Sequence, residues 1–316
     1  MIGEITQDAS KSSYVPSVEV KEFIAKVKKD YTQGHQILTK QWPELNNRSV
    51  LDDMDHGRKM FNAFVDEDCE DPADAWKWRG TRSMARNKGI GMHANLTASY
   101  LLPSFDAQNE DSDIDRDMSE FMTDLVDWMA QDENSNYKEN FLSLVFAMQH
   151  DPIVYLGAEF YEVMQEIKVK TEDGSTTKKE ILDEVLSGFK APIYTADQIL
   201  LTNAFERNPQ KHRFIGKRQW IEYDEAKAKY GEYDNFEYVK AGHMVIYNDE
   251  DGLFYEVKDE EHPDLVEEFT AMYRRDDTEV CFLGGIPMLK GELESHRMRH
   301  RDNFDAPRYN IQQFGF

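Results

Sequence analysis

The chain has 316 residues, of which 40% are hydrophobic and 12% aromatic. This is enough apolar material for a folded protein of roughly two domains, and it excludes a chain that is disordered throughout. With 61 acidic against 37 basic residues, the net charge is −24, which on average repels a phosphate backbone and argues against tight nucleic-acid binding. Such acidity either keeps the protein soluble or lets it stand beside DNA without adhering to it, and charge alone does not separate the two.

Membrane insertion and secretion have no support in the sequence. The longest apolar runs, such as residues 141–148, are far shorter than the ~20 residues that a membrane helix needs. Residues 1–16 are expected to be a flexible polar tail rather than a leader, and no lipidation signal is present. We therefore expect a soluble chain made in the cytoplasm.

The two cysteines, Cys69 and Cys281, lie far apart in unrelated contexts. We expect idle thiols in a reducing compartment, with a disulfide between them as the less favoured alternative. No CxxC or Cys/His cluster suggests structural zinc, and we expect no cofactor.

The first half of the chain is predicted to be helical. Residues 17–41 place Val20, Phe23, Ile24, Val27 and Tyr31 on one helical face, and Trp42-Pro43 is expected to stop this helix. A second helix is predicted over residues 49–65, and the acidic stretch 66–74 is expected to be a loop. The candidate core positions of the second helix are Leu51, Met54, Met60 and Phe64.

Residues 82–150 show further helical patterns. A helix over 82–102 is expected to be interrupted by Gly89 and Gly91. An amphipathic helix follows, preceded by acids that suit its N-terminal end, and residues 137–150 are expected to form its partner helix, closed by Pro152. The apolar face of the first is Met118, Phe121, Met122, Leu125, Val126 and Met129, and that of its partner is Phe141, Leu142, Val145 and Met148.

From residue 151 the pattern changes to strands. Residues 153–170 are rich in β-formers and end at a turn over 172–175, whereas 179–189 fit helix or strand. Residues 220–230 are expected to be helical, with Asp224 as N-cap and Gly231 at the C-terminal end. Residues 243–247 and 253–257 are expected to form a hairpin, and 269–273, 280–283 and 287–289 further strands.

These patterns predict an α+β fold: a helical region over 17–150 followed by a mixed, strand-rich region over 151–316. The sequence ends in the apolar, strand-like stretch 309–316. Because chains usually end in mobile polar residues, we expect it to be part of a longer protein.

The candidate metal site is weak. His296 and His300 lie four residues apart and would share one face of a helix, with Asp302 or Glu294 as a third ligand. Zinc hydrolases with this spacing carry a glutamate after the first histidine, and Arg297 stands there instead. A metal-dependent hydrolase is kept only as an alternative, and we expect no enzyme.

Two other ligand motifs are incomplete. Asp111, Asp113 and Asp115 imitate the start of a calcium loop, but Arg116 and Met122 occupy the positions that require glycine and glutamate. Gly89 and Gly91 are half of a dinucleotide-binding fingerprint. No P-loop motif and no GxSxG elbow is present, so neither a P-loop ATPase nor a serine hydrolase of the GxSxG type is indicated.

The most basic segment covers residues 207–218. It is a candidate subunit-interface or DNA-proximal patch, and the global charge favours contact with an acidic face of an identical neighbour. Its members are Arg207, Lys211, His212, Arg213, Lys217 and Arg218.

Part of the sequence resembles the portal proteins of tailed bacteriophages. Portal proteins contain a segment in which one strand leads into a basic strand and then a short helix. Residues 192–231, PIYTADQILLTNAFERNPQKHRFIGKRQWIEYDEAKAKYG, are similar to this segment. An aromatic-rich strand followed by a glycine-containing one resembles 267–289, EEFTAMYRRDDTEVCFLGGIPML. The closing segment resembles 300–316, HRDNFDAPRYNIQQFGF, and the acidic stretch, two helices and strand of 109–165 follow the same order, so the resemblance covers roughly residues 80–316.

This resemblance implies a structural subunit rather than an enzyme. The matched region would be the outer α+β part of the portal subunit, called the wing, with stem, clip and crown expected beyond residue 316. Such subunits form a ring, commonly of twelve copies, at one capsid vertex of the virion, where double-stranded DNA passes during packaging and ejection. The implied partners are further copies of the chain, terminase, capsid or scaffold proteins and head-completion or tail proteins, and another virion adaptor or head-closure protein is the remaining alternative.

Overall fold

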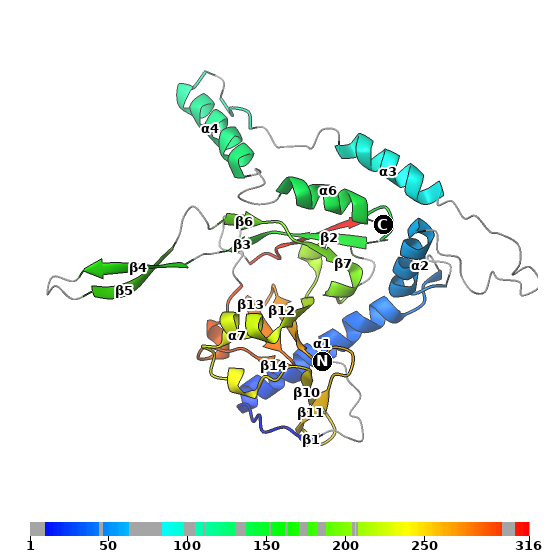
Figure 1. Ribbon diagram of the computed structural model, residues 1–316, viewed down its shortest axis with the longest axis vertical. Coiled ribbons are helices and arrows are strands. Elements are labelled where there is room, and N and C mark those ends of the chain that lie inside the picture. Colours follow the sequence, from blue (N-terminus) through cyan, green and yellow to red (C-terminus); the bar gives the residue numbers. More distant parts are fainter. Residues whose placement is uncertain are drawn as a thin grey trace, which may run out of the picture. The chain divides into compact units, whose positions relative to one another are not determined.

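The computed structural model describes residues 10–43, 47–62, 84–97, 105–109, 111–129, 137–151, 153–161, 164–170, 176–182, 188–203, 206, 208–298 and 307–315. They belong to two compact units, the first within Met1–Asp55 and Thr195–Tyr309 and the second within His56–Tyr194 and Asn310–Phe316. Each unit thus draws on two stretches of the chain, which is a different division from the predicted regions 17–150 and 151–316. The predicted α+β class is confirmed, with helices dominating the first half and strands the second (Figure 1).

The first unit is built on a five-stranded antiparallel sheet in the order β14-β13-β12-β9-β8. The central strand β12 places Phe269 opposite Arg218 of β9 and Phe282 of β13. Gly284 and Gly285 join β13 to β14 with φ angles of 51° and 83°, the positive values that the tightest hairpin turns need. The strand bounds are Ile199–Leu201 for β8, Ile215–Glu222 for β9, Leu265–Tyr273 for β12, Thr278–Leu283 for β13 and Ile286–Pro287 for β14.

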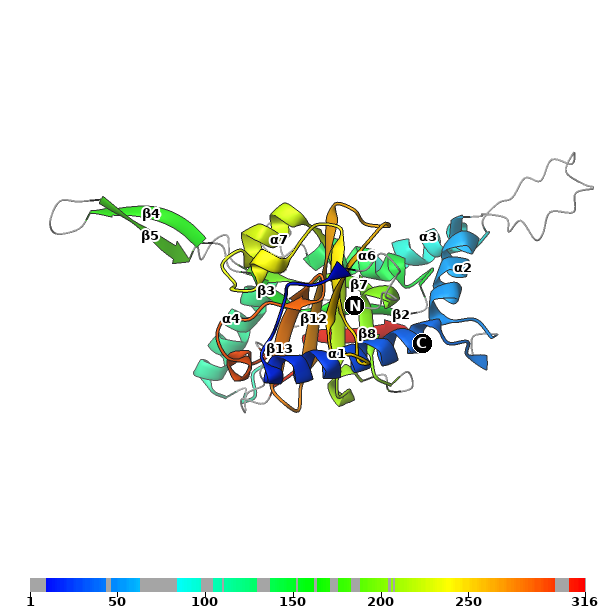
Figure 2. The same cartoon turned by 90° about the horizontal axis from the view of Figure 1, so that it is seen from below.

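Helix α1, Val18–Thr39, covers one face of this sheet (Figure 2). The Ser17 side chain caps it by accepting from the Val20 amide, and it ends before Trp42-Pro43, as predicted. Phe23 lies 5.9 Å from the Tyr273 ring and 6.2 Å from Phe282, while Tyr31 lies 4.9 Å from Phe269. The predicted core face is confirmed at four of its positions, since Phe23, Ile24, Val27 and Tyr31 are buried.

Helix α7, Tyr223–Tyr230, packs on β9 and β12. The predicted N-cap was wrong: Trp220–Glu222 completes strand β9, Glu222 precedes the helix, and Asp224 lies in its first turn. There its negative charge still suits the positive helix end. Gly231 does follow the helix, in right-handed conformation at φ −60°.

A smaller sheet in the first unit has the order β1-β11-β10. Strands β10, His243–Tyr247, and β11, Phe254–Lys258, form the predicted hairpin. Strand β1, Ser10–Lys11, pairs with β11, and Tyr14 is buried against Phe254 at 5.6 Å. Residues 10–14 of the predicted tail are therefore part of the unit, and residues 1–9 lie outside the described residues.

Short 3₁₀ turns occur at Ala196–Gln198 (η4), Pro209–Lys211 (η5), Phe236–Tyr238 (η6) and Leu293–Ser295 (η7).

Helix α2, Val50–Asn62, forms where the second helix was predicted. Met54 is buried, but the predicted core position Met60 is 55% exposed and Phe61 is buried in its place. Phe61 packs edge-on against Phe146 at 5.4 Å, and Arg58 donates two hydrogen bonds to the buried Asp151 at 2.8 and 2.9 Å. Phe64 and the expected loop 66–74 lie outside the described residues.

Helix α3, Met84–Thr97, runs without a break through Gly89 and Gly91, so the predicted interruption was wrong. A Cβ at Gly89 would lie 2.4 Å from Oε1 of Gln149 and 2.9 Å from the Phe61 ring. Glycine therefore serves close packing at this position rather than ending the helix.

Helix α6, Tyr137–Ala147, packs beside α3, with Nε2 of His93 3.1 Å from the carbonyl oxygen of Leu142. The predicted pairing of residues 118–129 with 137–150 is thus replaced by a pairing of α3 with α6. On α6, Leu144 is buried, whereas the predicted inward residue Met148, directly after the helix, is 43% exposed.

Helix α4, Asp113–Met129, confirms the predicted amphipathic helix but not its burial. Met118 and Phe121 are 57% and 59% exposed. Asp113 and Asp115 lie in the first turn, as expected from their charge rather than from a calcium loop.

Strands complete the second unit. Strand β2, Ile153–Gly157, pairs with β15, Ile311–Gly315, in a sheet of order β15-β2-β7, where β7 is Ile193–Thr195. Strand β3, Glu159–Tyr161, pairs with β6, Gly188–Lys190, and β4, Met164–Lys170, pairs with β5, Thr176–Leu182. The segment 179–189, which fitted helix or strand, is therefore strand in its described parts.

Candidate functional site

The predicted basic patch is distributed over several elements of the first unit. Lys211 ends the η5 turn, Arg213 follows it, and Lys217 and Arg218 lie on β9. Arg207 lies outside the described residues. Lys217 stands opposite Thr270 of β12 and Ile199 of β8, so it is held in the middle of the sheet rather than at an edge.

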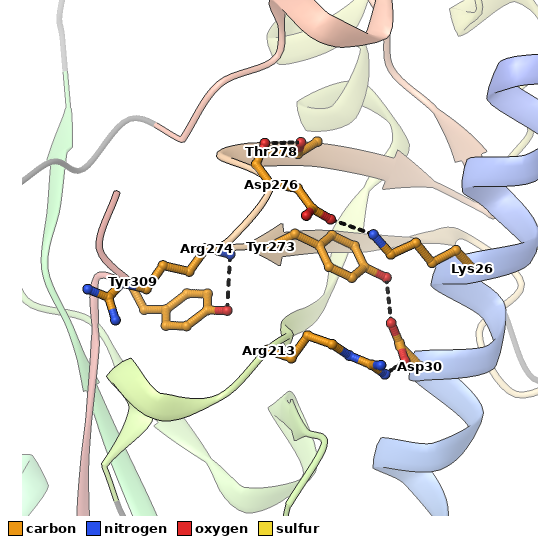
Figure 3. Close-up of polar contacts among 8 residues, drawn as sticks. All are labelled: Lys26, Asp30, Arg213, Tyr273, Arg274, Asp276, Thr278 and Tyr309. Carbon is orange, nitrogen blue, oxygen red and sulfur yellow. Dashed lines mark hydrogen bonds and ion pairs between the residues drawn. The ribbon is translucent and has the colours of Figure 1, made fainter. Parts of the chain in front are cut away.

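Arg213 pairs with a buried carboxylate of helix α1. Its guanidinium donates to Asp30, which is only 2% exposed, and the Tyr273 hydroxyl donates to the other oxygen of Asp30 at 2.9 Å (Figure 3). Burial, together with the Asp30 carboxylate, raises the pKa of Tyr273 far above its ordinary value. This tyrosine therefore stays a neutral hydrogen-bond donor at any physiological pH.

An exposed ion pair lies beside this buried one. Lys26 donates to Asp276 at 2.5 Å, and its ammonium lies 4.2 Å from the centre of the Tyr273 ring (Figure 3). Both side chains of this pair are about half exposed, at 44% and 52%. The two pairs tie α1 to the end of β12 and the turn that follows it.

Arg218 pairs with a second buried carboxylate. Its Nε lies 3.3 Å from Glu267, which is 1% exposed, and the Tyr31 hydroxyl donates to the same carboxylate at 2.9 Å. Tyr31 comes from α1, so this contact joins the helix to the middle of β12. Burial and the neighbouring Glu267 raise the pKa of Tyr31 well above its usual range.

Glu268 is a third buried carboxylate, on the opposite face of β12 because neighbouring strand residues point to opposite sides. It accepts hydrogen bonds from Lys229 at 2.6 Å and from Tyr230 and Gln219. Burial by itself raises the pKa of Glu268, but Lys229 and these hydrogen bonds outweigh it, so the pKa lies below its ordinary value. The carboxylate is therefore ionised in the folded unit.

Cys281 lies beside Glu268, with Sγ 3.8 Å from its carboxylate. The thiol is free, and burial together with the Glu268 charge raises its pKa to about 12. Only the thiolate is a strong nucleophile, so Cys281 is chemically quiet at neutral pH. Cys69, the other cysteine, lies outside the described residues.

Two of the predicted cations thus neutralise buried acids of the same unit, and Lys211 lies 3.4 Å from Glu206. Three buried carboxylates of this unit, which we call the acid core, were not predicted from the sequence: Asp30, Glu267 and Glu268. Their signal was present in the sequence. Asp30 falls on the apolar face of α1, and the two glutamates interrupt an otherwise apolar strand.

The structure does not arrange the described residues of the candidate metal site as metal ligands. His296 follows the η7 turn and is not on a helix, so the HRMRH spacing does not produce a shared helical face at its described end. Its Nε2 accepts from the Lys290 amide at 3.1 Å. His300 and Asp302 lie outside the described residues, and within the described ranges no group of three or more His, Cys, Asp or Glu side chains is placed to hold a metal ion.

In the described part of the chain, no helix is both long and apolar enough to cross a membrane. No protein-family model matches the chain, and no curated protein sequence matches it significantly.

Proposed function

We propose that this chain is a structural subunit of a bacteriophage portal, a ring at one capsid vertex through which double-stranded DNA enters and leaves. In this role the chain carries out no reaction. It contacts identical neighbours, and the ring offers attachment for terminase, capsid or scaffold proteins and head-completion or tail proteins.

The observation that carries the proposal is how the resembling segments come together. Residues 192–231 supply β8, β9 and α7, and residues 267–289 supply most of β12, all of β13 and β14. These are the five neighbouring strands of one sheet, with α7 packed on it. Two segments that resemble portal proteins independently in sequence therefore form one structural module.

The charge distribution supports the same proposal. A wall that binds phosphates through many cations would hold DNA and hinder its passage, whereas an acidic wall leaves it free to slide. The net charge is −24, and Arg213 and Arg218 are paired with Asp30 and Glu267. Both cations are thereby largely neutralised within the unit that carries them.

The proposal is tested by the mass of the particle that the complete gene product forms. Portal rings close through head-to-tail contacts between identical subunits. Mass photometry at micromolar concentration should show one dominant species of about twelve subunit masses, and a sample that stays monomeric would refute the proposal. A small oligomer of two to six copies would instead favour a virion adaptor or head-closure protein.

Binding to DNA provides a second test. We expect a fluorescently labelled duplex to show only weak association at physiological salt, at or beyond the 10⁻⁴–10⁻⁶ M range of non-specific binding. Nanomolar binding that is lost when Lys217 and Lys211 are replaced by glutamine would contradict the proposal, because the patch would then grip DNA.

A further inference from the structure

Helix α4 of the second unit presents a row of exposed apolar side chains. Of the large hydrophobic side chains that are exposed in the described residues, four lie on this one helix. We call them the α4 seam: Ile114, Met118, Phe121 and Trp128, with exposed fractions of 77%, 57%, 59% and 49%. Apolar side chains that gather on one exposed surface and are bordered by polar residues mark a site of interaction with another molecule.

The α4 seam has the spacing of a helix that packs lengthwise against another helix. Ile114, Phe121 and Trp128 follow one another at intervals of seven residues, so they lie on one side of the helix. The Thr123 hydroxyl oxygen accepts from the Phe105 amide at 3.1 Å. Thr123 lies about 200° around the helix axis from Phe121, so this contact with the preceding segment is on the side away from the seam.

Acidic residues border the α4 seam. They stand directly before each residue of the seven-residue repeat or one turn after it: Asp113, Asp117, Glu120, Asp124 and Asp127. All five are exposed. The helix contains a single basic residue, Arg116, which pairs with Asp113 at the N-terminal end. The seam is therefore apolar along its centre and negatively charged along its border.

These acids decide which molecule can cover the seam. Two copies of α4 would bring acids against acids, and like charges at the flanking positions of paired helices oppose pairing. A lipid surface is also disfavoured, because helices that lie on membranes carry lysine and arginine on their polar face. A helix with apolar residues along one side and lysine or arginine beside them would bury the seam and neutralise its border together.

We propose that α4 is the docking site for a partner protein that supplies a basic amphipathic helix. The apolar residues of that helix cover Ile114, Phe121 and Trp128, and its lysine or arginine side chains pair with bordering acids such as Asp117 and Asp124. The apolar contacts provide the affinity, and the charges select the partner and its register.

The test is fluorescence anisotropy of the full chain with labelled peptides of three heptads at physiological salt. The first peptide carries leucine at its a and d positions and lysine at e and g, the second carries glutamate in place of lysine, and the third is the first in scrambled order. We expect the lysine peptide to bind saturably at micromolar concentration and the other two at least about tenfold more weakly. Absence of saturation overturns the proposal, and so does equal binding of the scrambled peptide, because binding would then follow net charge.

Substitutions of exposed residues localise the site. Phe121→Ser removes the central residue of the repeat and should weaken binding of the lysine peptide at least about tenfold. The double variant Asp117→Lys, Asp124→Lys should lose the lysine peptide to a similar extent and bind the glutamate peptide instead, a gain that a misfolded chain would not show. Glu260→Lys, Glu261→Lys makes the same charge change on exposed residues of the first unit and should leave the affinity within about twofold. Equal losses in the two double variants would overturn the proposal.

Mass photometry of the chain without peptide distinguishes a partner protein from a second copy of the chain. We expect Phe121→Ser to leave the particle mass unchanged, whether the unchanged chain is a monomer or a ring. A lower mass in this variant would show that the α4 seam joins copies of the chain, and the proposal would be wrong. Peptide binding does not require a ring, so this proposal and the portal proposal fail separately.

Discussion

The clearest prediction about the acid core concerns the effect of Asp30 on the stability of the first unit. The substitution Asp30→Asn keeps the shape of the side chain and removes its charge. The Tyr273 hydroxyl can still donate to the amide oxygen, but the amide nitrogen then faces the guanidinium of Arg213, so two donors meet. The hydrogen bond from Arg213 is lost, and its guanidinium must turn to water.

The magnitude follows from burial. Breaking a buried ion pair costs about 3–5 kcal/mol when both partners are enclosed. Here Asp30 is 2% exposed but the Arg213 side chain is 53% exposed. Water can therefore solvate the guanidinium once its ion pair is lost, which lowers the cost. We expect a loss of about 1–3 kcal/mol in the free energy of unfolding, which corresponds to about 2–4 °C in Tm per kcal/mol for a domain of 150–250 residues.

The assay is urea denaturation followed by circular dichroism, with Asp276→Asn as the matched control. Asp276 carries the same charge and pairs with Lys26, but both side chains are about half exposed, so its replacement should cost less than about 1 kcal/mol. If Asp30→Asn were no more destabilising than Asp276→Asn, Asp30 would not stabilise α1 against β12, and the role given to the acid core would be wrong.

Three further predictions concern Glu268, the glycines Gly216 and Gly91, and Cys281. Glu268 has a pKa below its ordinary value in the folded unit, so its contribution to stability is complete above the unfolded pKa and is lost as pH falls through the folded one. Urea midpoints measured from neutral pH down to about pH 2 should therefore fall less steeply in Glu268→Gln than in the unchanged chain, and equal slopes would contradict this. A Cβ at Gly216 would lie 2.6 Å from two carbons of the Phe269 ring, so Gly216→Ala should destabilise the protein by about 1–3 kcal/mol. A Cβ at Gly91 would have nothing within 4 Å, so Gly91→Ala should be neutral or stabilise α3 by up to about 1 kcal/mol. Thermal melts that rank the two variants in the opposite order would refute the packing argument. Because the pKa of Cys281 is about 12, peptide mass spectrometry should find it unmodified by iodoacetamide in the folded chain and modified after denaturation, and rapid labelling of the folded chain would show a more accessible thiolate.

The local elements were predictable where a periodic pattern carried them. The face Phe23, Ile24, Val27 and Tyr31 predicted α1, and the two strand-like stretches 243–247 and 253–257 predicted the hairpin of β10 and β11. Both signals act over a few residues, so the sequence contains them directly. The class of the fold follows from the same patterns.

Long-range pairing was not predictable from such patterns. The apolar stripe of α4 predicted a buried helix, but Met118 and Phe121 are more than half exposed and α6 packs with α3 instead. Periodicity identifies an apolar face without naming its partner. Gly89 shows the same limit, because its role in close packing depends on Gln149 and Phe61 from distant parts of the chain.

The sequence predicted which basic residues belong to the candidate site, but not which residues they contact. The basic residues of 207–218 were evident, but their partners Asp30 and Glu267 are remote in sequence. An acid on an apolar face requires a cation or a donor nearby, which is a usable signal for its burial. The identity of the partner needed the topology, in which α1 crosses β12.

The portal proposal is tested most directly by imaging. Negative-stain electron microscopy of the complete gene product should give end-on averages of a closed ring with a central channel and about twelve-fold symmetry. Averages that show only single compact particles, at concentrations where mass photometry also finds monomers, would contradict the proposal.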